Sequence, residues 1–228
     1  MKISPTLTEV KEIAKTGKYD ILPVSCEILS DFITPIEAMR ILQNVSTHCY
    51  LLESAQANEA WGRYTFLGYD PKLEINCIDG HMKLGKLSVE TENPSEYIRQ
   101  ILSEYKSPKF DYLPSFTGGL VGYFSYDYLG YKEKSIRGKA KDTEDFKDVD
   151  LMLFDKVIAF DNLCQKIILI ANMSLDAPET GYNKAIVELK QLRELLMHGE
   201  KKQNMGGKLL GEVTPLFEKE QYLSLIHI

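Results

Sequence analysis

Apolar residues recur at helical spacing in four stretches of the chain, each preceded by residues typical of a helix start. The clearest start is Thr34-Pro35-Ile36-Glu37, where Thr34 can cap the helix, Pro35 fits its first turn and Glu37 completes a capping box. The sequence predicts helices that begin at Ser4-Pro5-Thr6 (ending near Gly17), at Thr34 and at Asn93-Pro94-Ser95-Glu96, and a longest helix over 177–198 with a buried stripe of Tyr182, Ile186, Leu189, Leu192 and Leu196.

Short apolar or alternating runs between these helices predict strands. Asp79-Gly80 separates two of the runs and is typical of a tight hairpin. The mixture of helices and hairpins favours an α+β domain, with largely antiparallel sheets and flanking helices, over a doubly wound parallel sheet. The expected strands are 21–29, 49–53, 63–67, 73–78, 81–87, 117–126, 151–160 and 166–171.

The chain changes character after the longest predicted helix. Residues 199–213 are largely polar around Gly206-Gly207 and predict a linker, after which Thr214-Pro215 predicts a further helix. We therefore expect one large domain over 1–198, a linker over 199–213 and the start of another unit over 214–228.

Composition narrows the classes of protein. Of the 228 residues, 44% are hydrophobic and 26% charged, which excludes wholesale disorder, and the net charge of −6 argues against a nucleic-acid partner. No basic start with an apolar run and no apolar stretch of about 20 residues occurs, so we expect a cytoplasmic protein with no membrane partner. Four scattered cysteines without a C-x-x-C pair predict no zinc site.

Leu51-Leu52-Glu53-Ser54 is the first candidate binding motif. A buried strand that ends in Glu-Ser is unusual, because burying an unpaired carboxylate is costly. Glu53 can accept from an ammonium and Ser54 can donate to a carboxylate, which are the two groups of a free amino acid. The plainer alternative is that the strand ends there and both side chains are solvated.

Two further motifs have structural alternatives. Arg63, in the run from Trp61 to Gly68, can hold a carboxylate through its guanidinium, or form a salt bridge at a strand edge. Gly118-Gly119-Leu120-Val121-Gly122 precedes a strand pattern and has no Lys-Ser/Thr, so close approach of another backbone is a better explanation than phosphate binding. No G-x-S-x-G, H-E-x-x-H or H-x-E signature occurs.

These three motifs, in this order and followed by Asp150-Leu151-Met152-Leu153-Phe154-Asp155, resemble the N-terminal region of anthranilate synthase component I, a chorismate-utilising enzyme. The resemblance covers about residues 5–222 and is specific because the set is ordered. It implies the N-terminal lobe of the chorismate-utilising fold, with 1–198 as a tryptophan-binding regulatory lobe and 214–228 as the truncated start of the chorismate-binding catalytic domain.

The resemblance also implies a function. The family's enzyme is a lyase that converts chorismate and ammonia to anthranilate and pyruvate in a magnesium-dependent reaction of tryptophan biosynthesis, and a glutamine amidotransferase partner delivers the ammonia. Tryptophan inhibits it by feedback. The tryptophan-site match falls on Leu52, Glu53 and Ser54, whereas the catalytic and Mg²⁺-binding residues belong to a C-terminal half that is not in this chain.

The chain departs from the family after Tyr222, so we expect a truncated sequence that is inactive alone. Two other functions stay open. One is the large component of aminodeoxychorismate synthase, which shares the architecture and releases no pyruvate. The other is a non-catalytic module that senses an amino acid. We also expect the strand ending at Ser54 and the Gly-Tyr-Phe strand to expose apolar surface, because both lack charges.

Overall fold

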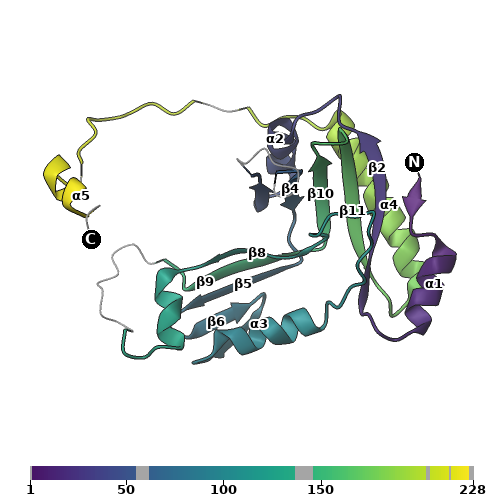
Figure 1. Cartoon of the computed structure of the whole chain (residues 1–228), viewed down its shortest axis with the longest axis horizontal. Helices are drawn as coiled ribbons and strands as arrows, with labels where there is room; N and C mark the ends of the chain where they lie inside the picture. Colours follow the sequence, from purple (N-terminus) through teal and green to yellow (C-terminus); the bar gives the residue numbers. More distant parts are fainter. Residues whose placement is uncertain (1, 55–61, 137–145, 204–205, 216, 226–228) are drawn as a thin grey trace.

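The computed structural model describes residues 2–54, 62–136, 146–203, 206–215 and 217–225. Within these ranges six strands form one sheet, in the order β1-β2-β11-β10-β4-β3, and five form a second, in the order β7-β6-β5-β9-β8 (Figure 1). Neighbouring strands are antiparallel and helices flank both sheets, so the predicted α+β class is confirmed.

The first sheet contains β1 (Ile3–Ser4), β2 (Ile21–Leu29), β3 (Cys49–Leu52), β4 (Tyr64–Tyr69), β10 (Lys156–Asp161) and β11 (Lys166–Ser174). The second contains β5 (Leu73–Ile78), β6 (His81–Leu84), β7 (Leu87–Glu90), β8 (Gly119–Phe124) and β9 (Val149–Phe154). The helices are α1 (Leu7–Lys15), α2 (Pro35–Val45), α3 (Pro94–Ser103), α4 (Pro178–His198) and α5 (Lys219–Leu225), with a 3-10 helix at Tyr126–Tyr131.

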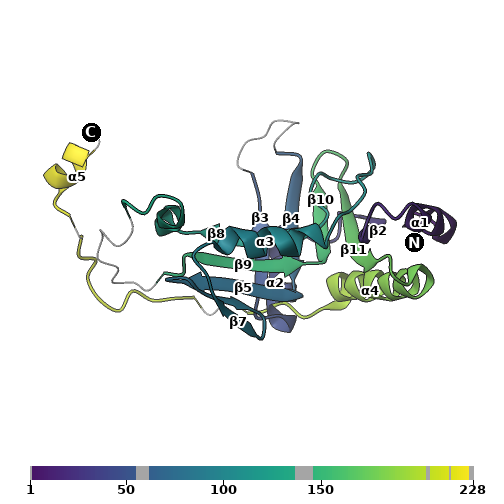
Figure 2. The same ribbon diagram turned by 90° about the horizontal axis from the view of Figure 1, so that it is seen from below.

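Both faces of the first sheet are covered. Alternate residues of β11, such as Leu169, pack with α1, α2 and α4 in the largest core, whereas Ile168 and Ile170 pack on the opposite face beneath Leu113 of the segment before β8. Burial on both faces explains why β11 is a continuous apolar run instead of an alternating one. The second sheet has a smaller core, where α3 packs through Ile98 (Figure 2).

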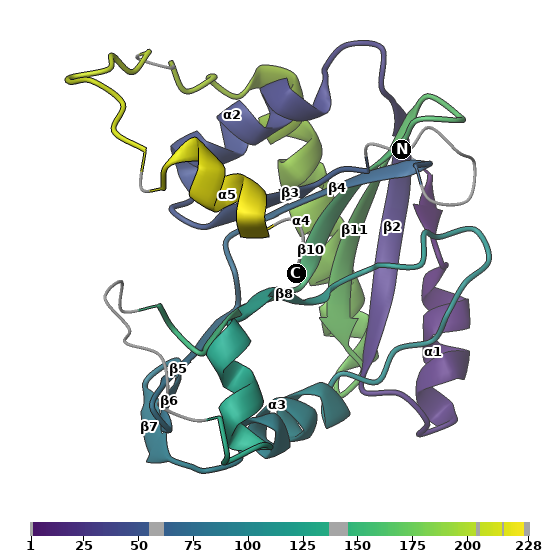
Figure 3. The ribbon, with the colours of Figure 1, turned by 60° about the vertical axis from the view of Figure 1, so that its left-hand side comes forward.

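The strand predicted over 151–160 is wrong as a single strand. The structure ends β9 at Phe154 and begins β10 at Lys156, and the two belong to different sheets. β4, which pairs with β10, and β5, which pairs with β9, are joined from one sheet to the other through Asp70-Pro71-Lys72, where the Lys72 amide donates to the Leu153 carbonyl at 2.7 Å. The chain therefore changes sheet at two neighbouring places, the β4–β5 connection and the β9–β10 connection. Figure 3 shows the two sheets on either side of this bend.

Local signals at helix and turn ends are mostly confirmed. Thr34 and Glu37 form the predicted capping box, and Asp79 and Gly80 take positive φ values of 49° and 84° in the tight turn between β5 and β6. The cap predicted at Asn93 is wrong, because its side-chain oxygen accepts from the Ser95 hydroxyl and from the Lys132 ammonium and caps no backbone N–H of α3. The strand predicted over 81–87 is also divided, into β6 and the start of β7.

The segment after α4 is partly attached to the domain. The Lys202 amide donates to the Arg40 carbonyl at 3.0 Å, and the Arg40 Nε donates to the Lys202 carbonyl at 2.9 Å, so this residue is held against α2. The helix start predicted at Thr214 is wrong. α5 begins at Lys219, and residues 206–215 form neither helix nor strand. The predicted domain boundaries stay predictions.

Candidate functional site

Leu52, Glu53 and Ser54 lie at and just after the end of β3, one of the two edge strands of the first sheet in the described part of the chain. All three are exposed, with 48% of Leu52 accessible to solvent. β3 pairs with β4 alone among the described residues, which leaves its other edge open. The expectation of a continuously buried strand is wrong, since an edge strand buries only part of its length. The exposed Glu53 and Ser54 at its end remain accessible to a ligand.

Tyr50 anchors β3 to the second sheet. Its ring is buried and packs edge-on against Phe154, with the ring centroids 4.8 Å apart. Burial raises the pKa of the Tyr50 hydroxyl, whose oxygen has no hydrogen-bond partner among the described residues. Gly68 on β4 makes room for this ring, because a Cβ there would lie 2.2 Å from Tyr50 Cε1. This Tyr–Gly pair was not predicted, and its cross-strand register is the only signal of it.

Arg63 forms the salt bridge that was the alternative to carboxylate binding. Its Nη2 donates to Asp161 Oδ2 at 2.6 Å and its Nε donates to Asp161 Oδ1 at 3.1 Å. The Asp161 side chain is only 3% exposed. Burial opposes its ionisation, but hydrogen bonds from Arg63 and from the Cys164 amide more than compensate and keep the pKa of Asp161 below its usual range. Trp61, from the same motif, lies outside the described residues.

The glycines of the Gly118–Gly122 motif permit close packing. A Cβ on Gly122 would lie 1.9 Å from the Asp150 carbonyl oxygen, and one on Gly118 would lie 2.5 Å from Asn172 Nδ2. Both glycines have positive φ, at 154° and 145°. The prediction that another backbone approaches here is confirmed for Gly122, where the neighbouring strand β9 passes.

β8 is another edge strand. It lies opposite β7 at one end of the second sheet among the described residues, and Tyr123 and Phe124 at its end are 41% and 50% exposed. Tyr126, just beyond it, is 86% exposed. The expected apolar exposure at both strands is therefore present at β8 and, through Leu52, at β3.

The described residues offer neither a metal-binding cluster nor a membrane-spanning helix. No group of three or more His, Cys, Asp or Glu side chains there is placed to hold a metal ion, so these residues do not fit a magnesium site. None of the described helices combines the length and apolarity needed to cross a bilayer.

The family model described as chorismate binding enzyme matches residues 47–228. The chain belongs to this family. It is 34% identical over 198 residues to anthranilate synthase component 1 of Acetivibrio thermocellus, covering 84% of this chain and 39% of that protein. It is 36% identical over 196 residues to anthranilate synthase component 1 of Pseudomonas aeruginosa, covering 82% of this chain and 39% of that protein.

Family membership confirms the resemblance inferred from the ordered motifs. A solved structure of anthranilate synthase component I from Streptococcus pneumoniae TIGR4 is 25% identical, with a TM-score of 0.48 over 73% of this chain and 36% of that one. The chain spans about two-fifths of the length of the curated relatives it matches.

Proposed function

We propose that this chain is the N-terminal, tryptophan-binding lobe of an anthranilate synthase component I. The main support is membership of the chorismate binding enzymes together with relatives that carry this name at 34% and 36% identity. The complete enzyme would be a lyase that joins ammonia to chorismate, loses the ring hydroxyl and eliminates pyruvate to leave anthranilate. The first relatives are called component 1, which supports a second component, here a glutamine amidotransferase that supplies ammonia.

The lobe's own chemistry is recognition of an amino acid. Glu53 would accept hydrogen bonds from the ammonium of tryptophan, and the Ser54 hydroxyl would donate to its carboxylate. Both lie at the open edge of β3, which is compatible with a pocket completed by further polypeptide. The described residues contain no fitting metal cluster, so the Mg²⁺ site would belong to residues outside the described part of the chain.

Feedback inhibition at Ser54 is the feature to test. In an enzyme that joins this lobe to the family's catalytic part, Ser54→Phe should abolish most tryptophan inhibition of anthranilate formation and leave kcat largely unchanged. The reason is that an inhibitor shifts an equilibrium only through contacts that differ between the two states, and Ser54 would contribute only to the inhibited state.

Ser88→Phe is the matched control, since Ser88 is an exposed serine on β7, the edge strand at the other end of the second sheet. It should retain full inhibition. Equal inhibition of the Ser54 variant and the parent would contradict the assignment. Calorimetry of the 228-residue chain with tryptophan provides a second measurement: undetectable binding favours a pocket shared with other polypeptide, whereas micromolar binding favours a self-sufficient sensor.

A further inference from the structure

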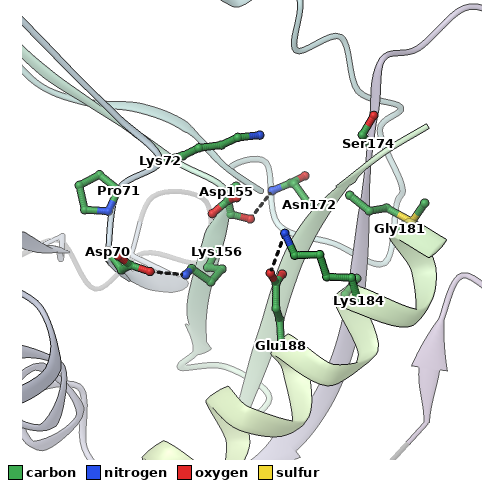
Figure 4. A pocket seen from close by; sticks show the side chains of 12 residues that line it. Asp70, Pro71, Lys72, Asp155, Lys156, Asn172, Ser174, Gly181, Lys184 and Glu188 are labelled. Carbon is green, nitrogen blue, oxygen red and sulfur yellow. Dashed lines mark hydrogen bonds and ion pairs between the residues drawn. The ribbon is translucent and has the colours of Figure 1, made fainter. Parts of the chain in front are cut away.

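A polar hollow of about 470 Å³ lies at the bend where the chain crosses between the sheets (Figure 4). Its walls come from the β4–β5 connection, the β9–β10 connection, the end of β11 and the first turns of α4. This volume lies in the range of small-molecule sites, which occur preferentially at junctions between structural units. The charged side chains that line it are Asp70, Lys72, Asp155, Lys156, Lys184 and Glu188.

Four of these six charges form pairs. Lys156 donates to Asp70 at 2.7 Å, and Lys184 lies 3.7 Å from Glu188 one turn along α4. The Lys156 side chain is only 18% exposed. Although its burial works against the charge, the hydrogen bond to Asp70 raises the pKa of Lys156 above its usual value. The first pair is thus charged and well held, and it forms one side of the hollow.

The remaining two charges are opposite in sign and are not joined. Lys72 and Asp155 have no ion-pair partner among the described residues, and they do not pair with each other. The Lys72 ammonium lies 5.4 Å from the centre of the Tyr105 ring. Asp155 is half-buried and its carbonyl accepts from the Asn172 amide at 2.8 Å, so its backbone is fixed.

We propose that this hollow binds a small zwitterion, the ammonium and carboxylate pair of a free α-amino acid. The carboxylate is held by Lys72, and the ammonium is held by Asp155. A simple anion would meet three carboxylates in the lining and a simple cation would meet three ammonium groups, so a ligand with both charges is the best match.

The site is separate from the proposed tryptophan site. It shares no residue with the end of β3, and its lining comes from both inter-sheet connections and α4. A ligand bound here would contact both connections at once and would therefore stabilise one relative orientation of the two sheets. Because the two sites differ in residues, the failure of either proposal leaves the other unaffected.

The test is nuclear magnetic resonance titration of the 228-residue chain with four probes. L-alanine and L-methionine carry both charges, propionate is alanine without its ammonium, and ethylamine is alanine without its carboxylate. We expect saturable shifts of the Gly181 and Asn172 amide signals with the two amino acids, and binding of propionate and ethylamine weaker by about tenfold or more, as expected for the loss of one charged hydrogen bond.

Two variants locate the site. Lys72→Gln and Asp155→Asn should each weaken alanine binding by about tenfold. Lys190→Gln on α4 and Asp111→Asn, at exposed residues outside the lining, should leave it unchanged. Lys72 is exposed, so its variant should fold, and circular dichroism verifies this. The proposal is overturned if propionate or ethylamine binds as tightly as alanine, if the shifts appear at Leu52 instead, or if no probe gives a saturable shift.

Discussion

At the residue scale, the Arg63–Asp161 pair illustrates how a motif residue can serve structure. Asp161 accepts from the guanidinium of Arg63 and from the backbone amides of Leu163 and Cys164, at 3.1 and 3.0 Å. It therefore holds the turn between β10 and β11 and ties it to the start of β4. The arginine looked free in the sequence because its partner lies 98 positions away.

Asp161→Asn should lower the free energy of unfolding by about 2 kcal/mol at neutral pH, because a buried charged hydrogen bond to Arg63 is lost. The pKa of Asp161 is lower in the folded state than in the unfolded state. The charged carboxylate therefore contributes its full share to the free energy of unfolding above the unfolded pKa of about 3.9, and this share is lost as pH falls through the folded pKa. Urea unfolding of variant and parent from pH 7 to pH 3 measures this. The difference in free energy of unfolding between Asp161→Asn and the parent should narrow below about pH 4, and the control Asp111→Asn should match the parent throughout. A difference that does not depend on pH would contradict its assignment to the charge of Asp161.

At the element scale, β8 and β9 fit together only because Gly122 has no side chain. The carbonyl of Asp150 and the Cα of Leu151 occupy the position of its missing Cβ, at 1.9 and 2.8 Å. Its φ of 154° adds a conformational reason, since residues with a Cβ rarely adopt that backbone geometry. Strand pairing at this edge of the second sheet therefore depends on one glycine.

Gly122→Ala should destabilise the chain by more than about 2 kcal/mol, since the backbone of β9 cannot yield as a flexible side chain would. Gly207→Ala is the control, because no atom lies within 4 Å of its Cβ position, and it should change stability by less than about 0.5 kcal/mol. Thermal denaturation followed by circular dichroism compares the two. Similar melting temperatures for both variants would show that β8 tolerates a side chain there.

At the scale of the whole molecule, the two sheets end in open edges that carry exposed apolar side chains. Leu52 at β3 and Tyr123, Phe124 and Tyr126 at and after β8 are between 41% and 86% exposed. Large apolar patches are uncommon on isolated monomers and usually mark an interaction surface, and open strand edges that carry exposed apolar side chains are places where such a surface can form. It agrees with a chain that spans about two-fifths of its relatives' length.

A dye that fluoresces on exposed apolar surface should bind the 228-residue chain more strongly than it binds a compact control protein of similar size. Tyr126→Ser should reduce the signal because Tyr126 is the most exposed of these aromatic side chains, whereas Leu29→Ser, at the far end of β2, should not reduce it to the same extent. Fluorescence titration measures both. Binding no stronger than that of the control protein would remove the case for an exposed docking surface.

Helix starts and turns were predictable because their causes are local. The capping box of Thr34 and Glu37 needs only residues three apart, and the turn at Asp79-Gly80 needs only two neighbours. The Asn93 cap was wrong because the Ser95 hydroxyl and the Lys132 ammonium bond the side-chain oxygen that would have capped the helix, and Lys132 is 39 positions away in the sequence.

By itself, the sequence determined the fold class, most helix ends and the family, since periodicity, capping and ordered motifs are written in neighbouring residues. Only the tertiary structure decided that the apolar run around Asp155 divides between two sheets, that Arg63 is paired, and that Lys72 and Asp155 line the same hollow. Each of these depends on contacts between residues far apart in the chain. The apolar residues before and after the bend show the same pattern in the sequence, so the pattern cannot tell which sheet each of them joins. Only the packing of the two sheets decides their partners.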